Sequence, residues 1–214
     1  MLLAERLAAD RPRPGRTRMA LALLRPSLRA MRLAPLAGGV VVALALAVLP
    51  NAVGLTLSLP QAVLFLRGTA VALALGLAFV LDDPATATTE VLPVSARLRR
   101  LVRLAPVLVV AGAVWEISWL TMRQSTAGLP ADLGWEGAGI AALTLAIAAW
   151  TSVGGVAAAP ALLLLVLAAA FAPDAVAPFP APRSPQWGET HVVWAVVTAL
   201  AVIALGAAGD ERNG

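Results

Sequence analysis

Three charged residues, Arg67, Glu116 and Glu136, interrupt long apolar stretches of this sequence. An unpaired charge in hydrocarbon costs at least ~2.5–3.5 kcal/mol. Arg67 and Glu116 each lie about six residues, and therefore about 9 Å, from one end of an apolar stretch. Because the two charges are opposite and lie at one depth, we predict a structural salt bridge between Arg67 and Glu116. In the alternative interpretation, Arg67 extends alone to the surface and Glu116 faces a hydrated crevice.

Other chemically reactive side chains are sparse. The single histidine, His191, follows Glu189 by two residues, so in a helix the two side chains point about 200° apart and form no dyad. We predict an interfacial histidine bonded to water or backbone, with proton sensing as the alternative. A Ser-His-Asp arrangement is formally possible, whereas a two-histidine zinc motif is not. Ser118 and Ser152 lie in no glycine-flanked nucleophile motif, so an intramembrane enzyme ranks lowest.

The residue types that the sequence lacks exclude several kinds of site. It has no lysine, which a Walker-type phosphate loop requires, and no cysteine for disulfides or thiolate sites. We therefore expect no enzyme activity, cofactor or metal site in this chain. The arginines adjoin apolar segments instead of forming a solvated patch, so nucleic acid is not an expected partner.

The elements that carry these residues are predicted from the composition. Hydrophobic residues make up 60% of the chain and charged residues 13%, against about half and about a quarter in soluble domains. A membrane span needs about 20 apolar residues. We predict an all-α, polytopic membrane protein with about six transmembrane helices, the fourth and fifth forming a tight hairpin. The apolar runs are 34–55, 61–81, 104–122, 137–152, 156–172 and 189–207.

Arginine positions predict the orientation of the spans. The first 33 residues carry eight arginines and the segment 82–103 carries four, whereas the segments 123–135 and 173–188 carry one each. Positive charge stays on the cytoplasmic side, so both termini are predicted to be cytoplasmic. Three tryptophans would then lie near the outer interface, as indole rings prefer: Trp119, Trp135 and Trp187.

The domain organisation follows from this orientation. Residues 1–33 are predicted to be a cytoplasmic tail with an interfacial amphipathic helix, 34–207 a six-span domain, and 208–214 a second cytoplasmic tail. In the helix 18–32, four arginines fall within one stripe suited to lipid phosphates: Arg18, Arg25, Arg29 and Arg32. A solvated cytosolic helix is the alternative. Pro50 and Asn51 either kink the first span or follow its end near Leu49.

The cytoplasmic segment 82–103 contains signals for a short helix. Asp83 before Pro84 favours a helix start, and Ser95 can cap a second helix that continues into the third span. We interpret this loop helix either as a docking element for a cytosolic partner or as a capped turn. The residues assigned to partner contact are Asp82, Asp83, Pro84, Thr88, Thr89, Glu90, Arg97, Arg99 and Arg100.

The chain resembles the short permeases of ATP-binding-cassette exporters. The resemblance rests on the basic amphipathic helix, the helical loop after the second span and the six spans, with Leu-Asp-Asp-Pro at 81–84 and Arg-Leu-Arg-Arg at 97–100 similar to actinobacterial permeases. It implies a bacterial inner-membrane subunit that pairs with a second permease, identical or different, and with a separate ATPase subunit that binds ATP and magnesium. The family usually has short re-entrant helices where 173–188 carries five prolines.

Two other functions remain open at the level of sequence. A self-contained ion- or proton-coupled carrier or channel would use Arg67, Glu116 and Glu136 along its path. A structural membrane subunit of a larger complex would leave the same pattern of apolar runs. The exporter permease is the favoured hypothesis, and the transported substrate is not specified by any motif.

Overall fold

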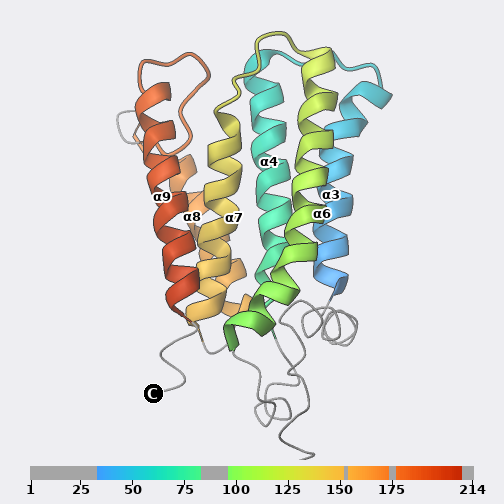
Figure 1. The fold of residues 1–214 in the computed structure, drawn as a ribbon. Coiled ribbons are helices and arrows are strands. Elements are labelled where there is room, and N and C mark those ends of the chain that lie inside the picture. Colours follow the sequence, from blue (N-terminus) through green and yellow to red (C-terminus); the bar gives the residue numbers. More distant parts are fainter. Residues whose placement is uncertain (1–32, 83–95, 152–153, 174–176, 209–214) are drawn as a thin grey trace, which may run out of the picture.

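The computed structural model describes residues 33–82, 96–151, 154–173 and 177–208, and the regular secondary structure of these ranges is entirely α-helical. Successive helices run antiparallel in one bundle (Figure 1). The first helix begins, and the last helix finishes, at the same end of this bundle. The predicted all-α class is thus confirmed for the described residues. The helices are α3 (Leu33–Ala52), α4 (Leu59–Ala78), α6 (Ala96–Ser125), α7 (Leu133–Trp150), α8 (Gly155–Ala170) and α9 (Trp187–Ala207).

The helices coincide with the six apolar runs, and five of them are long and apolar enough to cross a membrane. The sixth, α8, has 16 residues and is about 24 Å long, shorter than the ~30 Å hydrocarbon core. Large apolar side chains such as Val109, Leu164 and Ile203 are exposed on the outside of the bundle. Such a surface is consistent with a polytopic membrane protein.

Helix α4 lies at the centre of the bundle, where it packs against α3, α6, α7 and α8, while α9 packs on α7. Backbone contact between α3 and α4 depends on glycine: a Cβ atom added to Gly39 would lie 2.5 Å from the carbonyl oxygen of Ala72. Gly76 meets the backbone of α3 in the same way, with Pro35 O 3.1 Å from an added Cβ. Small residues at a helix crossing permit this close approach in membranes.

The turns of the bundle follow local sequence signals. Pro50 lies in the last turn of α3, and the helix ends at Ala52, three residues after the predicted end near Leu49. Ser58 and Gln61 form a capping box that begins α4. The tight hairpin predicted between the fourth and fifth runs is confirmed, since α7 and α8 pack together across the short connection 151–154.

Helix α8 begins at a contact between residues that are far apart in sequence. The Gly155 N–H donates a hydrogen bond to Asp82 Oδ1 at 2.7 Å. The preceding residue, Gly154, has φ +51°, a left-handed conformation that favours glycine. A carboxylate at a helix N-terminus satisfies a free N–H and complements the helix dipole. Asp82 thereby ties the end of the α4 segment to the α7–α8 hairpin.

Candidate functional site

A buried ion pair joins α4 and α7. Arg67 Nε donates to Glu136 Oε2 and Arg67 Nη2 donates to Glu136 Oε1, both at 2.7 Å. The Glu136 side chain is 1% exposed and the Arg67 side chain 15%. Two parallel, charge-assisted hydrogen bonds are the strongest geometry available to a guanidinium and a carboxylate. The two charges therefore compensate each other inside the bundle.

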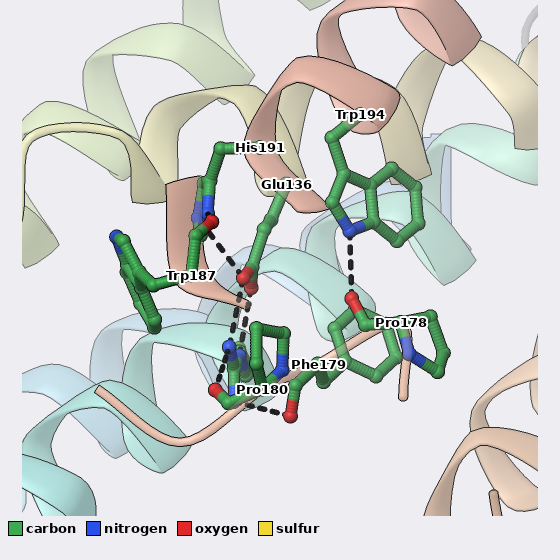
Figure 2. Close-up of polar contacts among 8 residues, drawn as sticks. Glu136, Pro178, Phe179, Pro180, Trp187, His191 and Trp194 are labelled. Atoms are coloured by element: carbon green, nitrogen blue, oxygen red, sulfur yellow. Dashed lines mark hydrogen bonds and ion pairs between the residues drawn. The ribbon is translucent and has the colours of Figure 1, made fainter. Parts of the chain in front are cut away.

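The remaining guanidinium donors hold the loop before α9. Arg67 Nη1 donates to the carbonyl oxygen of Phe179 at 3.2 Å, and Nη2 donates to that of Pro180 at 2.9 Å. The guanidinium carbon also lies 5.4 Å from the Phe179 ring centroid and 5.7 Å from that of Trp187. In Figure 2, dashed lines join the Glu136 carboxylate and the carbonyl oxygens of Phe179 and Pro180 to one guanidinium group, which is drawn without a label. Four of the five guanidinium N–H groups are thus engaged.

His191 completes this cluster from α9. Its Nδ1 lies 2.6 Å from the carbonyl oxygen of Trp187, which can only accept, so Nδ1 carries a hydrogen. Its Nε2 lies 3.1 Å from Glu136 Oε1, near enough for an ion pair when the ring is protonated, although the ring is not aligned for a hydrogen bond. The predicted backbone bond of His191 is confirmed. Glu189 is exposed on α9 while His191 is buried, as expected for residues that form no dyad.

A second contact fixes the same loop. Trp194 Nε1 donates to the carbonyl oxygen of Pro178 at 2.8 Å, and the Trp194 ring stacks on Phe179 with centroids 5.5 Å apart. Figure 2 shows this contact beside Glu136 and His191. In the described part of this loop, 177–186, Pro178 and Pro180 present their carbonyls to the bundle and no helix forms. We call Arg67, Glu136, His191 and the Phe179 and Pro180 carbonyls the polar cluster.

The predicted salt bridge between Arg67 and Glu116 is wrong. Arg67 pairs with Glu136 instead, and Glu116 is exposed. Two features explain the difference. Helix α7 begins lower in the view of Figure 1 than α4 begins and than α6 ends. Glu136 lies in this first turn of α7, where its carboxylate meets Arg67. On α6, the neighbouring Trp115 fills the interface, packing against α4 residues and over Gly137 of α7.

Glu116 lies at the edge of a groove of about 310 Å³ between α4, α6 and α7. Within the described residues, its carboxylate has no ion pair or hydrogen bond. All other residues that line the groove are apolar, aromatic or glycine. Glu116 and Glu136 therefore lie on neighbouring helices but in opposite environments.

Most of the residues assigned to partner contact cannot be compared with the structure. Asp83, Pro84, Thr88, Thr89 and Glu90 lie outside the described residues, as do the four arginines of the predicted helix 18–32 and the cap at Ser95. Arg97 and Arg99 lie in the first turn of α6, at the end of the bundle where α3 begins (Figure 1). Arg100 follows them and lines a second cavity, of about 430 Å³, between α6 and α9. Asp82 caps α8, a contact for which the sequence holds no local signal.

The polar cluster is suited to holding helices and a loop together, because its charges are compensated and its carbonyls are bonded. Among the described residues, no group of three or more His, Cys, Asp or Glu side chains could hold a metal ion. The sequence matches no protein-family model, no curated protein and no solved structure.

Proposed function

We propose that this chain is the membrane-spanning permease subunit of an ATP-binding-cassette exporter, coupled to a separate ATPase subunit through the segment 82–103. The observation that carries the proposal is the length of α6, whose 30 residues extend over about 45 Å. The hydrocarbon core is ~30 Å thick, so about 15 Å of this helix lies beyond it. The extension carries Arg97, Arg99, Arg100 and Arg103.

The orientation of the bundle supports the same proposal. The arginine-bearing start of α6 projects at the bundle end where α3 begins and α9 finishes (Figure 1). The segments at the opposite end, 123–135 and 173–188, carry one arginine each, Arg123 and Arg183. By the excess of positive charge, the arginine-rich end is the cytoplasmic one, and with α8 counted as a short sixth span both termini lie inside. A cytosolic ATPase would meet the α6 extension and the loop preceding it there.

The partners follow from the size of the bundle. In the described part of the chain, four helices pack against the central α4 and α9 packs on α7. A bundle of six helices is small for a translocation path, so two permeases, identical or different, would form it together. ATP and magnesium would bind the ATPase subunit, since this sequence has no lysine for a phosphate loop. The chain would reside in the bacterial inner membrane.

Co-purification tests this function. The tagged chain is co-expressed with the ATP-binding-cassette ATPases encoded in its own genome, and the bound ATPase is quantified. Replacing Pro84 to Glu90 by a glycine-serine linker, or making the double variant R97A/R99A, is expected to abolish most of the association. The matched control is R123A, at the opposite end of the same helix. Equal retention in all variants, or no bound ATPase with the unaltered chain, contradicts the proposal.

A proton-coupled carrier is the second candidate, favoured by the 3.1 Å approach of His191 Nε2 to Glu136 Oε1. Two adjacent titratable groups in one buried cluster can pass a proton between them once the His191 ring turns into line with the Glu136 carboxylate. This function predicts proton flux into proteoliposomes without any ATPase, measured with an enclosed pH dye, and its loss in H191Q. The absence of flux from the unaltered protein excludes it.

A further inference from the structure

The groove between α4, α6 and α7 has the dimensions of a small binding site. Its volume of about 310 Å³ lies at the lower end of the range of about 300–1,000 Å³ for small-molecule pockets. Leu73 and Leu77 of α4 line one wall, and Ala138 and Ala141 of α7 line the other. Gly112 and Gly134 widen it, since a Cβ atom added to either would meet nothing within 4 Å. The groove would accept an apolar body.

Two side chains of α6 give the groove a charge preference. The Glu116 carboxylate is exposed at the edge of the groove and has no partner in the described part of the chain. The indole of the preceding residue, Trp115, also lines the groove. A carboxylate attracts a cation, and the face of an indole is the best aromatic surface for one. Glu116 lies six residues before the end of the apolar run 104–122, or about 9 Å along the axis. At that depth a charge is expensive without a counter-ion.

We propose that this groove binds an organic cation with an apolar body, whose positive group pairs with Glu116. An anionic lipid headgroup is disfavoured because, among the described residues that line the groove, the charged one is Glu116, which is negative. A second copy of the chain is disfavoured as well, because a two-fold axis along the membrane normal would bring two Glu116 residues to the same depth. The site goes beyond the exporter proposal, since binding requires neither an ATPase nor transport.

A pair of isosteric ions tests the site on the full chain in nanodiscs of phosphatidylcholine. Tetraphenylphosphonium and tetraphenylborate share shape and apolar surface and differ in the sign of their charge. Equilibrium dialysis is expected to show saturable binding of tetraphenylphosphonium, and Glu116→Gln is expected to raise its Kd at least about tenfold. Tetraphenylborate is expected to bind the unaltered chain more weakly than tetraphenylphosphonium, and E116Q is expected to reduce that difference.

Matched controls separate the groove from the rest of the bundle. Glu189→Gln removes an exposed carboxylate from α9 and is expected to leave the Kd unchanged. Gly112→Leu fills the groove and is expected to abolish binding, whereas Gly38→Leu, at an equally open position on α3, is expected to preserve it. If G112L does not fold, as judged by size-exclusion chromatography, G134L fills the same groove from α7.

Three outcomes overturn the proposal. The first is the absence of saturable tetraphenylphosphonium binding to the unaltered chain. The second is a Kd for E116Q within about twofold of that of the unaltered chain, or an equal loss in E189Q. The third is a fall in oligomeric mass in G112L, which would assign the groove to a second copy. None of these results bears on ATPase co-purification, so this site and the exporter function can fail separately.

Discussion

Glu136 and Glu116 are the same residue type on neighbouring helices of one bundle, yet their surroundings differ completely. Glu136 is 1% exposed and accepts two hydrogen bonds from Arg67, with His191 3.1 Å away. Glu116 is exposed at the edge of an apolar groove and has no partner within the described residues. A compensated charge stabilises the fold, whereas an uncompensated one at this depth calls for a ligand. The difference therefore assigns a structural role to Glu136 and a ligand-binding role to Glu116.

Among the variants that test this comparison, Glu136→Gln is expected to lose the most stability. The variant leaves the Arg67 guanidinium buried without a counter-ion, and breaking a buried pair costs about 3–5 kcal/mol. Denaturant unfolding in mixed micelles measures this loss, with E189Q, expected within about ±0.5 kcal/mol, as the exposed control. A loss below about 1 kcal/mol in E136Q would remove the structural role assigned to the pair.

A double variant tests whether the two charges act as a unit. Arg67→Met and Glu136→Met together replace the pair by flexible apolar side chains and leave no buried charge behind. The double variant is expected to be more stable than the sum of the single losses predicts, with an interaction energy of about 0.5–3 kcal/mol. Strictly additive losses from the same unfolding measurement would show that the residues contribute independently.

The sequence predicts the helices well because membrane spans are specified by composition along the chain. Each of the six apolar runs coincides with a helix, and the hairpin at 151–154 follows from its short connection. Pairing between helices is not specified in this way. Arg67 and Glu116 occur at matched depths in the sequence, but the partner of Arg67 depends on where α7 begins and on which way Trp115 points. The Asp82–Gly155 contact depends likewise on tertiary packing.

Trp194→Phe tests how firmly α9 holds the loop 177–186. The change removes the N–H that donates to Pro178 and keeps an aromatic ring against Phe179, so the expected loss of stability is about 0.5–1.5 kcal/mol. Trypsin can report the loop directly, because Arg183 lies in it. Faster cleavage after Arg183 is expected in W194F than in W150F, whose hydrogen bond to Ala204 lies at an exposed tryptophan far from the loop. Equal cleavage rates would contradict the anchoring role.

Asp82 extends the comparison to a third carboxylate, one that has a single backbone partner. Asp82→Ala removes the acceptor for the Gly155 N–H and is expected to cost about 1 kcal/mol, whereas Asp82→Asn keeps an acceptor oxygen and costs less. ATPase co-purification provides the second measurement. A role in capping alone predicts that D82N binds the ATPase normally, and a role in coupling predicts that D82N loses the ATPase while remaining stable.

The smallest effect on stability is expected from Glu116→Gln. A small effect would show that Glu116, unlike Glu136, does not stabilise the fold. Removing a charge that has no partner in the described fold leaves no other group uncompensated, so the free energy of unfolding should fall by less than about 0.5 kcal/mol. The same unfolding measurement as for E136Q checks this value. If E116Q loses several kcal/mol, Glu116 is held by a contact as important as that of Glu136, and it is not available to a cation. If stability is unchanged while tetraphenylphosphonium binding falls, two glutamates of one bundle have been separated into a structural residue and a binding residue.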